Sequence, residues 1–282
     1  MNRLLYRKTV NNVMLTLTGV CTLVTVAVLF VILGYLVYNG GKSVDWAFFT
    51  KLPLPPGENG GGMANAIVGS AEMVGLAALF GLPVGFFGGI YLAEFSGKTM
   101  GFLIRYTADL LNGVPSIVIG IFAWALVVVP LHNFSSLAGA VALAIMLIPI
   151  SLRSTEQFLS TVPNALREGA LALGAPKWKV LATVIVPAAM KGILTGMILA
   201  VARVAGETAP LLFTALNNQF WPRGLNQPTA SLPVMIYTHA IAPYDDWHRQ
   251  AWAAGLVLLA MVLLTNISAR WILSRGISVQ KG

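Results

Sequence analysis

The stretch LLNGVPSIVIGIFAWALVVVPLHNFSSLAGAVALAIMLIPISL, residues 110–152, contains no Asp, Glu, Lys or Arg over 43 positions. A helix rises about 1.5 Å per residue, so one crossing of a bilayer core needs roughly 20 residues. The stretch is too long for one crossing and suits two. The segment PLHNFSS, residues 130–136, is the expected break between them. A chain that contains such a stretch is predicted to be a membrane protein.

Four further runs of low charge are long enough to cross the same core. They cover residues 13–38, 65–95, 192–216 and 250–269. Together with the two crossings in 110–152, they predict an all-α, polytopic protein with six transmembrane helices. The segments 39–63 and 217–249 are polar or rich in proline and glycine, so we expect extramembrane loops there.

The basic residues are distributed unevenly over the expected loops. Thirteen Lys and Arg residues lie on the side of the two termini, and four lie on the opposite side. Because basic residues concentrate in cytoplasmic segments, both termini are predicted to be cytoplasmic. The expected organisation is an N-terminus at 1–12, a transmembrane domain at 13–272 with a cytoplasmic loop at about 154–190, and a tail at 273–282. The net charge of +8 then reflects topology, and no nucleic-acid partner is expected.

The composition and the polar motifs give no reason to expect an enzyme. Of the 282 residues, 57% are hydrophobic and 10% are charged, against about 25% charged in soluble domains. Two GK[ST] triplets, at 41–43 and 97–99, lack the upstream glycine of a phosphate-binding loop. The three histidines and the single Cys21 have no metal-ligand spacing. We therefore expect no metal, nucleotide or other cofactor in this chain, and no catalytic activity of its own.

The large loop is predicted to form a helix, a hinge and a second helix. Its central sequence is VPNALREGALALGAPKWKVLATVIVP, residues 162–187. Pro163 suits the first turn of a helix, Gly174 suits the left-handed position that ends one, and Pro176 opens the next. An apolar ridge is expected on one face of the first helix, formed by Leu166, Ala170 and Leu173. Such a ridge is typical of a helix that binds in a groove of another protein.

This segment resembles the EAA loop of ABC importer permeases. The matching positions are Glu168, Gly169, Ala170, Gly174, Val184, Val186 and Pro187. The consensus spacing is kept throughout, although Gly169 replaces the middle alanine and two valines replace Ile and Leu. In that family the loop is the coupling helix that docks on a cytoplasmic ATPase. The resemblance implies that Glu168, Gly169, Ala170, Gly174 and Pro187 belong to the ATPase-coupling surface. The alternative is an amphipathic helix that lies on the membrane.

Five further segments resemble the A-type permease subunit of bacterial phosphate-specific ABC transporters. They are GMANAI (62–67), GIYLAE (89–94), PSIVIG (115–120), ALGAPKW (172–178) and ARVAGETAPLL (202–212). The likeness runs from about residue 60 to residue 269. It implies the type I importer permease fold in the bacterial inner membrane, and a chain that supplies half of a pathway for inorganic phosphate.

The same resemblance implies a set of partners. These are a homologous C-type permease subunit, a dimeric ATPase that binds ATP and Mg, and a periplasmic phosphate-binding protein. Two other functions stay open at this point. One is a permease for another oxyanion, such as sulfate or molybdate, and the other is an ion-coupled secondary transporter. A membrane-embedded enzyme ranks third, since no catalytic constellation is present.

Two charged residues lie deep within the predicted span 192–216. Arg203 and Glu207 are four apart, so in a helix they share one face, and an ion in hydrocarbon is costly unless it is paired or faces a cavity. They are expected either to clamp the span to its neighbours or to line an oxyanion pathway. Arg153, at the end of the fourth span, is either an interfacial anchor or, as the resemblance suggests, part of the inner mouth.

The second span carries two further features. Gly81, Gly85 and Gly89 are spaced four apart, so they leave one helix face bare for a neighbouring helix. Glu72 lies near the end of the same span, where we expect it to be solvated or interfacial. Pro83 is expected to kink this helix.

Overall fold

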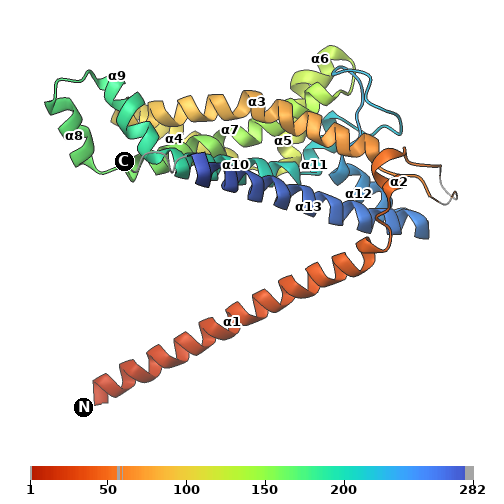
Figure 1. Ribbon diagram of the computed structural model, residues 1–282, viewed down its shortest axis with the longest axis horizontal. Helices are drawn as coiled ribbons and strands as arrows, with labels where there is room; N and C mark the ends of the chain where they lie inside the picture. Colours follow the sequence, from red (N-terminus) through yellow and green to blue (C-terminus); the bar gives the residue numbers. More distant parts are fainter. Residues whose placement is uncertain (1, 56–57, 59, 277–282) are drawn as a thin grey trace.

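The computed structural model describes residues 2–55, 58 and 60–276, and every regular element in that part of the chain is a helix (Figure 1). The long helices are α1 (Asn2–Gly41), α3 (Ala64–Glu94), α7 (Ser136–Ser160), α10 (Val186–Ala205) and α13 (Asp245–Gly276). The shorter helices are α2 (Trp46–Thr50), α4 (Lys98–Gly113), α5 (Ser116–Ala123), α6 (Val129–Leu131), α8 (Asn164–Ala172), α9 (Lys177–Val180), α11 (Ala209–Thr214) and α12 (Leu232–Ala240). Two π-helical segments, Trp124–Val128 and Leu181–Ile185, connect α5 to α6 and α9 to α10.

Five of the described helices are long and apolar enough to cross a membrane, and the bent pair 98–131 makes six if it is one span. The third span was predicted to begin near residue 110, and the helices of this region differ from that prediction. Helix α4 already begins at Lys98, and the chain bends by 103° between Gly113 and Ser116. Pro115 explains the bend, because proline has no N–H and disfavours helical geometry at the residue before it. The predicted break before α7 is confirmed, and Ser135 caps that helix by accepting a hydrogen bond from the Ala138 N–H at 3.1 Å.

The fifth span also differs from the prediction of 192–216. A continuous helical stretch runs from Lys177 through the π segment into α10 and ends at Ala205. Helix α11 then begins at Ala209 with a proline in its first turn. Pro210 cannot continue α10, because its ring would collide with the carbonyl of residue 206. Arg203 therefore lies in the last turn of α10, and Glu207 lies beyond its end.

The two expected loops contain short helices that the sequence reading missed. In 39–63, α2 is capped by Asp45, which accepts a hydrogen bond from the Phe48 N–H at 2.7 Å. In 217–249, α12 begins with a proline in its first turn, a position that proline favours. Both helices are fixed by burial, since Phe48 and Met235 belong to one apolar cluster.

The two π segments each precede a proline by the same interval. The first ends at Val128, two residues before Pro130, and the second ends at Ile185, two residues before Pro187. Proline removes one backbone donor and crowds the preceding turn, and a π turn is a recognised way to widen a helix locally. The wider turn accommodates each proline without ending the helix.

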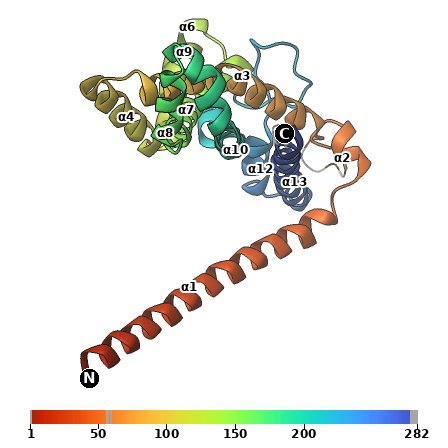
Figure 2. The same ribbon diagram turned by 60° about the vertical axis from the view of Figure 1, so that its left-hand side comes forward.

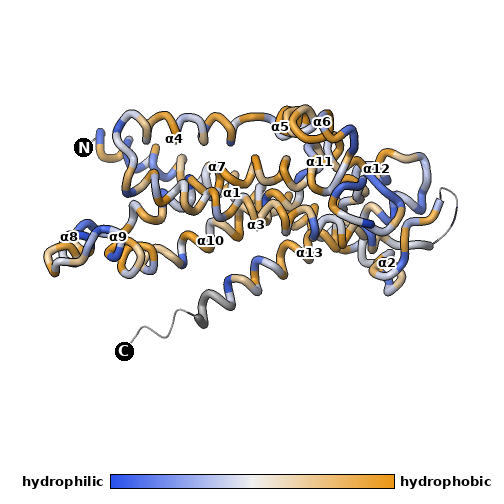
Figure 3. The backbone as a smooth tube through the Cα atoms, turned by 90° about the horizontal axis from the view of Figure 1, so that it is seen from above, coloured by the Kyte–Doolittle hydropathy of each residue, from blue (hydrophilic) through white to orange (hydrophobic). Residues whose placement is uncertain are grey.

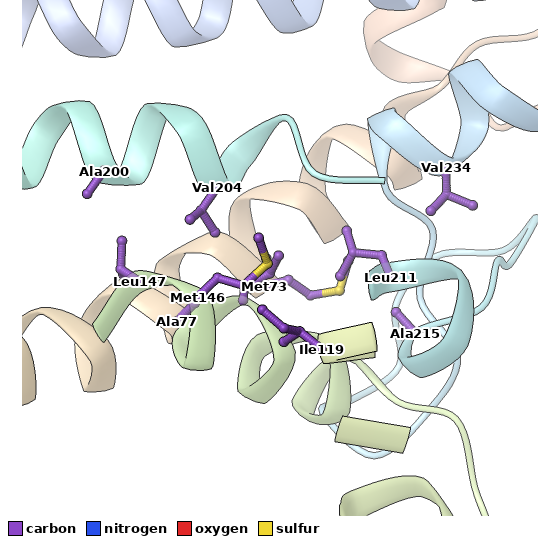
Figure 4. Packing of buried hydrophobic residues seen from close by; sticks show 11 residues of the cluster. Met73, Ala77, Ile119, Met146, Leu147, Ala200, Val204, Leu211, Ala215 and Val234 are labelled. Atoms are coloured by element: carbon purple, nitrogen blue, oxygen red, sulfur yellow. The ribbon is translucent and has the colours of Figure 1, made fainter. Parts of the chain in front are cut away.

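Helices α3 and α7 form the most extensive helix pair, and the glycine stripe lies between them. A Cβ atom added at Gly85 would lie 3.0 Å from the Ile148 carbonyl oxygen, and one at Gly89 would lie 2.7 Å from the Leu152 carbonyl oxygen. The expectation that these glycines serve packing is confirmed, and α3 continues through Pro83. Beside this pair, the main apolar core joins α3, α5, α7, α10 and α11, as Figure 4 shows at Met73, Ile119 and Val204.

Helix α1 leaves the bundle and contacts it chiefly through α13 (Figures 1 and 2). One end of the long axis holds the start of α1, the α8–α9 hairpin and the end of α13. The other end holds α2 and α6. Hydrophilic residues gather at both ends, with hydrophobic helices between them (Figure 3). Helix α13 continues to Gly276, so the predicted tail 273–282 begins inside a helix. Its remaining residues, 277–282, are outside the described residues.

Candidate functional site

Two adjoining cavities run along α7 and α10 and meet at Arg203. The smaller, of about 240 Å³, is lined by Arg203 and Glu207 among others. The larger, of about 540 Å³, is lined by Arg203 and Arg153. Both are also lined by Asn112 at the end of α4 and by Ile150 of α7. Together they form a passage from Glu207 to Arg153, whose wall is mostly apolar in the larger cavity.

Helical periodicity explains which residues face this passage. Thr195, Leu199 and Arg203 of α10 follow each other at intervals of four, and all three line the larger cavity. Ile150 and Arg153 of α7 are three apart and lie opposite them. The helix pair therefore presents hydroxyl, amide and guanidinium groups to the cavity along its length. Such groups are able to replace part of the hydration shell of an anion.

The structure places Arg203 and Glu207 in the same cavity but not in the expected pair. Both line the smaller cavity, yet α10 ends between them, and among the described residues no ion pair joins them. Arg203 is exposed in the isolated chain, and Glu207 is half-buried. The clamp interpretation of these two residues therefore has no contact to support it.

Arg153, in contrast, is held by carboxylates. Its Nε lies 2.9 Å from Asp109 Oδ1, and its Nη1 lies 2.5 Å from Glu156 Oε2. The other oxygen of Glu156 is 2.5 Å from Nε of Arg105. The Glu156 side chain is only 10% exposed, so this chain of alternating charges is a partly buried tie between α4 and α7. Arg153 thus belongs both to the cavity wall and to a structural link.

The sequence reading missed the other members of this link. Glu156 follows Arg153 by three residues, which is the spacing of a helical ion pair. That signal was readable, but the fourth span was expected to end near Arg153, whereas α7 continues to Ser160. Arg105 and Asp109 come from α4, so their position could not be read from local spacing.

Glu72 has a structural role rather than a solvated position. It is half-buried in α3, and Oε1 accepts a hydrogen bond from the Ser136 hydroxyl at 2.7 Å. Ser136 is the first residue of α7. Glu72 therefore ties the N-terminal part of α3 to the beginning of α7.

The hairpin α8–α9 confirms the predicted helix, hinge and helix. Pro163 and Pro176 stand immediately before the two helices, and Gly174 between them has φ +80°, a left-handed conformation that favours glycine. The expected ridge is only partly exposed. Leu166 and Leu173 are 48% and 90% exposed, but Ala170 is half-buried and packs on a cluster of the bundle. The prediction that Ala170 faces outward with them is wrong, because that side of α8 rests on the helix after it.

The other residues that the resemblance assigns to the coupling surface lie in two places. Glu168 and Gly169 are exposed on α8, and Gly174 is exposed at the hinge. Pro187 is exposed in the first turn of α10, outside the hairpin. Within the described residues, no group of three or more His, Cys, Asp or Glu side chains is placed to hold a metal ion.

The bundle of apolar helices, the cavities beside Arg203 and the exposed helical hairpin fit a membrane permease. The model of the family described as "Binding-protein-dependent transport system inner membrane component" matches residues 85–276. The chain belongs to this family, and it is a multi-pass protein of the inner membrane.

Curated relatives cover nearly the whole chain. A protein of Yersinia pestis named "Phosphate transport system permease protein PstA" is 44% identical over 271 residues, which are 96% of this chain and 92% of the relative. A protein of Haemophilus influenzae with the same name is 44% identical and covers 95% of both chains. A probable PstA of Methanocaldococcus jannaschii is 36% identical over 95% of both chains.

A solved structure supports the fold. A chain of the MetNI methionine ABC transporter, in an inward-facing conformation, superposes with a TM-score of 0.63 at 16% identity. The match covers 76% of this chain and 94% of that one. The permease fold of ABC importers that the sequence predicts is therefore the fold observed.

Proposed function

We propose that this chain is a permease subunit of an ATP-driven importer of inorganic phosphate. It forms half of the translocation pathway, and a homologous C-type permease forms the other half. A partner ATPase dimer binds ATP and Mg, and a periplasmic phosphate-binding protein delivers the anion. The observation that carries the proposal is the passage in which Arg203 presents a guanidinium that no carboxylate neutralises among the described residues.

Phosphate entering a low-dielectric passage loses hydration, and the protein must compensate for that loss. The planar guanidinium of Arg203 supplies charge and two parallel donors that match two phosphate oxygens. Asn112 and Thr195 add neutral polar groups beside it. At Arg153 the positive charge is already balanced by Asp109 and Glu156, so the anion is held more weakly there and leaves the passage.

The orientation follows from the basic residues. The end of the molecule with α8 and α9 is the cytoplasmic one, together with both termini, because it carries most of the Lys and Arg. Helix α8 then docks on the ATPase through its exposed side, with Glu168 and Leu173 outward. Ala170 and Gly174 act indirectly, by seating the helix and setting the hinge.

Transport by the assembled complex tests the proposal. In proteoliposomes containing this chain and its partner subunits, labelled phosphate should accumulate only with ATP on the ATPase side. A tenfold excess of sulfate or molybdate should leave uptake unchanged. Inhibition by either oxyanion would favour a permease for that anion, and uptake driven by an ion gradient without ATP would favour a secondary transporter.

A further inference from the structure

Two cations of the α8–α9 hairpin converge on one residue of the bundle. Nη2 of Arg167, in α8, lies 2.8 Å from Oε1 of Glu94. Nζ of Lys177, in α9, donates a hydrogen bond to the backbone carbonyl of Glu94 at 2.9 Å. Glu94 is the last residue of α3. Both helices of the hairpin are thus attached at the end of α3.

The same guanidinium reaches a second long helix. Nη2 of Arg167 donates to the carbonyl oxygen of Leu159, in the last turn of α7, at 2.9 Å. The Leu159 carbonyl also accepts a hydrogen bond from the Val162 N–H at 3.3 Å, so Arg167 is a further donor to this acceptor. A single side chain of α8 therefore holds the ends of α3 and α7 together.

Burial distinguishes this contact from an ordinary surface ion pair. The side chains of Arg167 and Glu94 are 23% and 10% exposed. An exposed pair is weakened by water and salt, whereas a shielded pair keeps its geometry. Nε of Arg167 and Oε1 of Glu94 are buried, and neither has a hydrogen-bond partner of good geometry in the described part of the chain. The pair therefore depends on the attraction between its two charges, at an N–O distance of 2.8 Å.

The position of the contact connects two surfaces. Leu166 and Leu173 expose the outer side of α8, while Arg167 points from the same helix into the bundle. Leu159 is six residues beyond Arg153, which lines the cavity on α7. A displacement of α8 thus acts on α7 less than two turns from the cavity, and on α3, which packs along α7.

We propose that Glu94 and Arg167 form the joint through which movement of α8 is transmitted to α3 and α7. They are positioning residues, since neither lines the cavities where Arg203 lies. The inference rests on the proposed coupling of α8 to a partner ATPase. It assigns the transmission of that movement to one ion pair rather than to the apolar packing of the hairpin.

The number of anions taken up per ATP hydrolysed tests the joint in the complete reconstituted complex. Glu94→Gln and Arg167→Gln should each lower this ratio by about tenfold, within the usual range of coupling between sites, while ATP hydrolysis continues. The double variant should be no worse than Arg167→Gln alone, because Arg167→Gln already removes the contacts with both Glu94 and Leu159. Arg167→Lys keeps the charge with fewer donors, so its ratio should fall between wild type and Arg167→Gln.

Arg249→Gln is the matched control, because Arg249 pairs with Asp246 in an exposed position of α13 outside the hairpin. Its ratio should equal that of wild type. An unchanged ratio in both Gln variants, or uptake and hydrolysis falling in proportion, would overturn the joint. If Arg167→Gln does not assemble, Arg167→Lys is used in its place, and an unchanged ratio in Arg167→Lys and Glu94→Gln would contradict the proposal. The ratio applies to whichever oxyanion wild type carries, so failure of the phosphate assignment is seen separately, in wild type alone.

Discussion

Replacing Gly89 by valine is expected to lower the stability of the folded protein and the amount of folded protein recovered. A Cβ atom at this position would lie 2.6 Å from Thr155 Cβ and 2.7 Å from the Leu152 carbonyl oxygen. One of these atoms belongs to the backbone of α7, so a rotamer change cannot relieve the collision. Overpacking of this kind typically costs about 1–3 kcal/mol or more, a large part of the stability of a native protein. The measurement is the fraction of detergent-extracted protein that is monodisperse, together with its melting temperature.

Gly75→Val is the matched control, because Gly75 lies in the same helix and a Cβ atom there would meet nothing within 4 Å. This variant should fold in normal amount. Equal loss in both variants would mean that α3 is sensitive to valine in general. Equal tolerance would mean that α3 and α7 do not pack as closely as described.

Arg203→Gln is expected to slow phosphate uptake by roughly ten- to a hundredfold, since a hydrogen bond to a charged group contributes about 1.5–3 kcal/mol. The amount of folded protein should stay the same, because no ion pair of Arg203 is lost. Arg203→Lys keeps the charge but loses the planar fork, so its rate should fall between those of Arg203→Gln and wild type. Uptake is measured with equal amounts of each variant in the full complex.

Arg153→Gln is a comparison variant that distinguishes a role in phosphate transport from a role in stability. It removes one of the two ion pairs that join α4 to α7, together with the Arg153–Glu156 pair within α7, so it should lower the melting temperature as well as uptake. If Arg203→Gln destabilises the protein as much as Arg153→Gln does, then Arg203 is a structural residue and its assignment to the pathway is wrong.

Much of the architecture was predictable because its signals are local. The apolar runs located the long helices, and the segment PLHNFSS located the break before α7. Pro163, Gly174 and Pro176 gave the hairpin, since each residue restricts its own backbone wherever the chain folds. The glycine stripe of α3 predicted a close helix contact, because glycines four residues apart leave one face of a helix without side chains.

The predictions were wrong where the end of a helix, or the direction in which a side chain points, depends on residues distant in the sequence. Hydropathy does not change at Gly206, so the sequence reading carried the fifth span to residue 216 and placed Glu207 on the helix face of Arg203. Pro115 and Pro210 begin new helices, a local signal that hydropathy alone does not contain. Tertiary packing decides that Ala170 faces the bundle and that Glu156 pairs with Arg105. The spacing of residues along one helix gives no information about such packing.

Thiol labelling of the cavity tests the central claim, that the passage beside Arg203 carries the anion. Thr195→Cys is made in a Cys21→Ser background, because Cys21 is exposed on α1. In the assembled complex, a charged, membrane-impermeant thiol reagent should modify position 195, and phosphate with ATP should slow the reaction several-fold. Thr50→Cys, at an exposed position of α2 outside both cavities, should show no effect of phosphate. A rate at position 195 that phosphate leaves unchanged would contradict the claim.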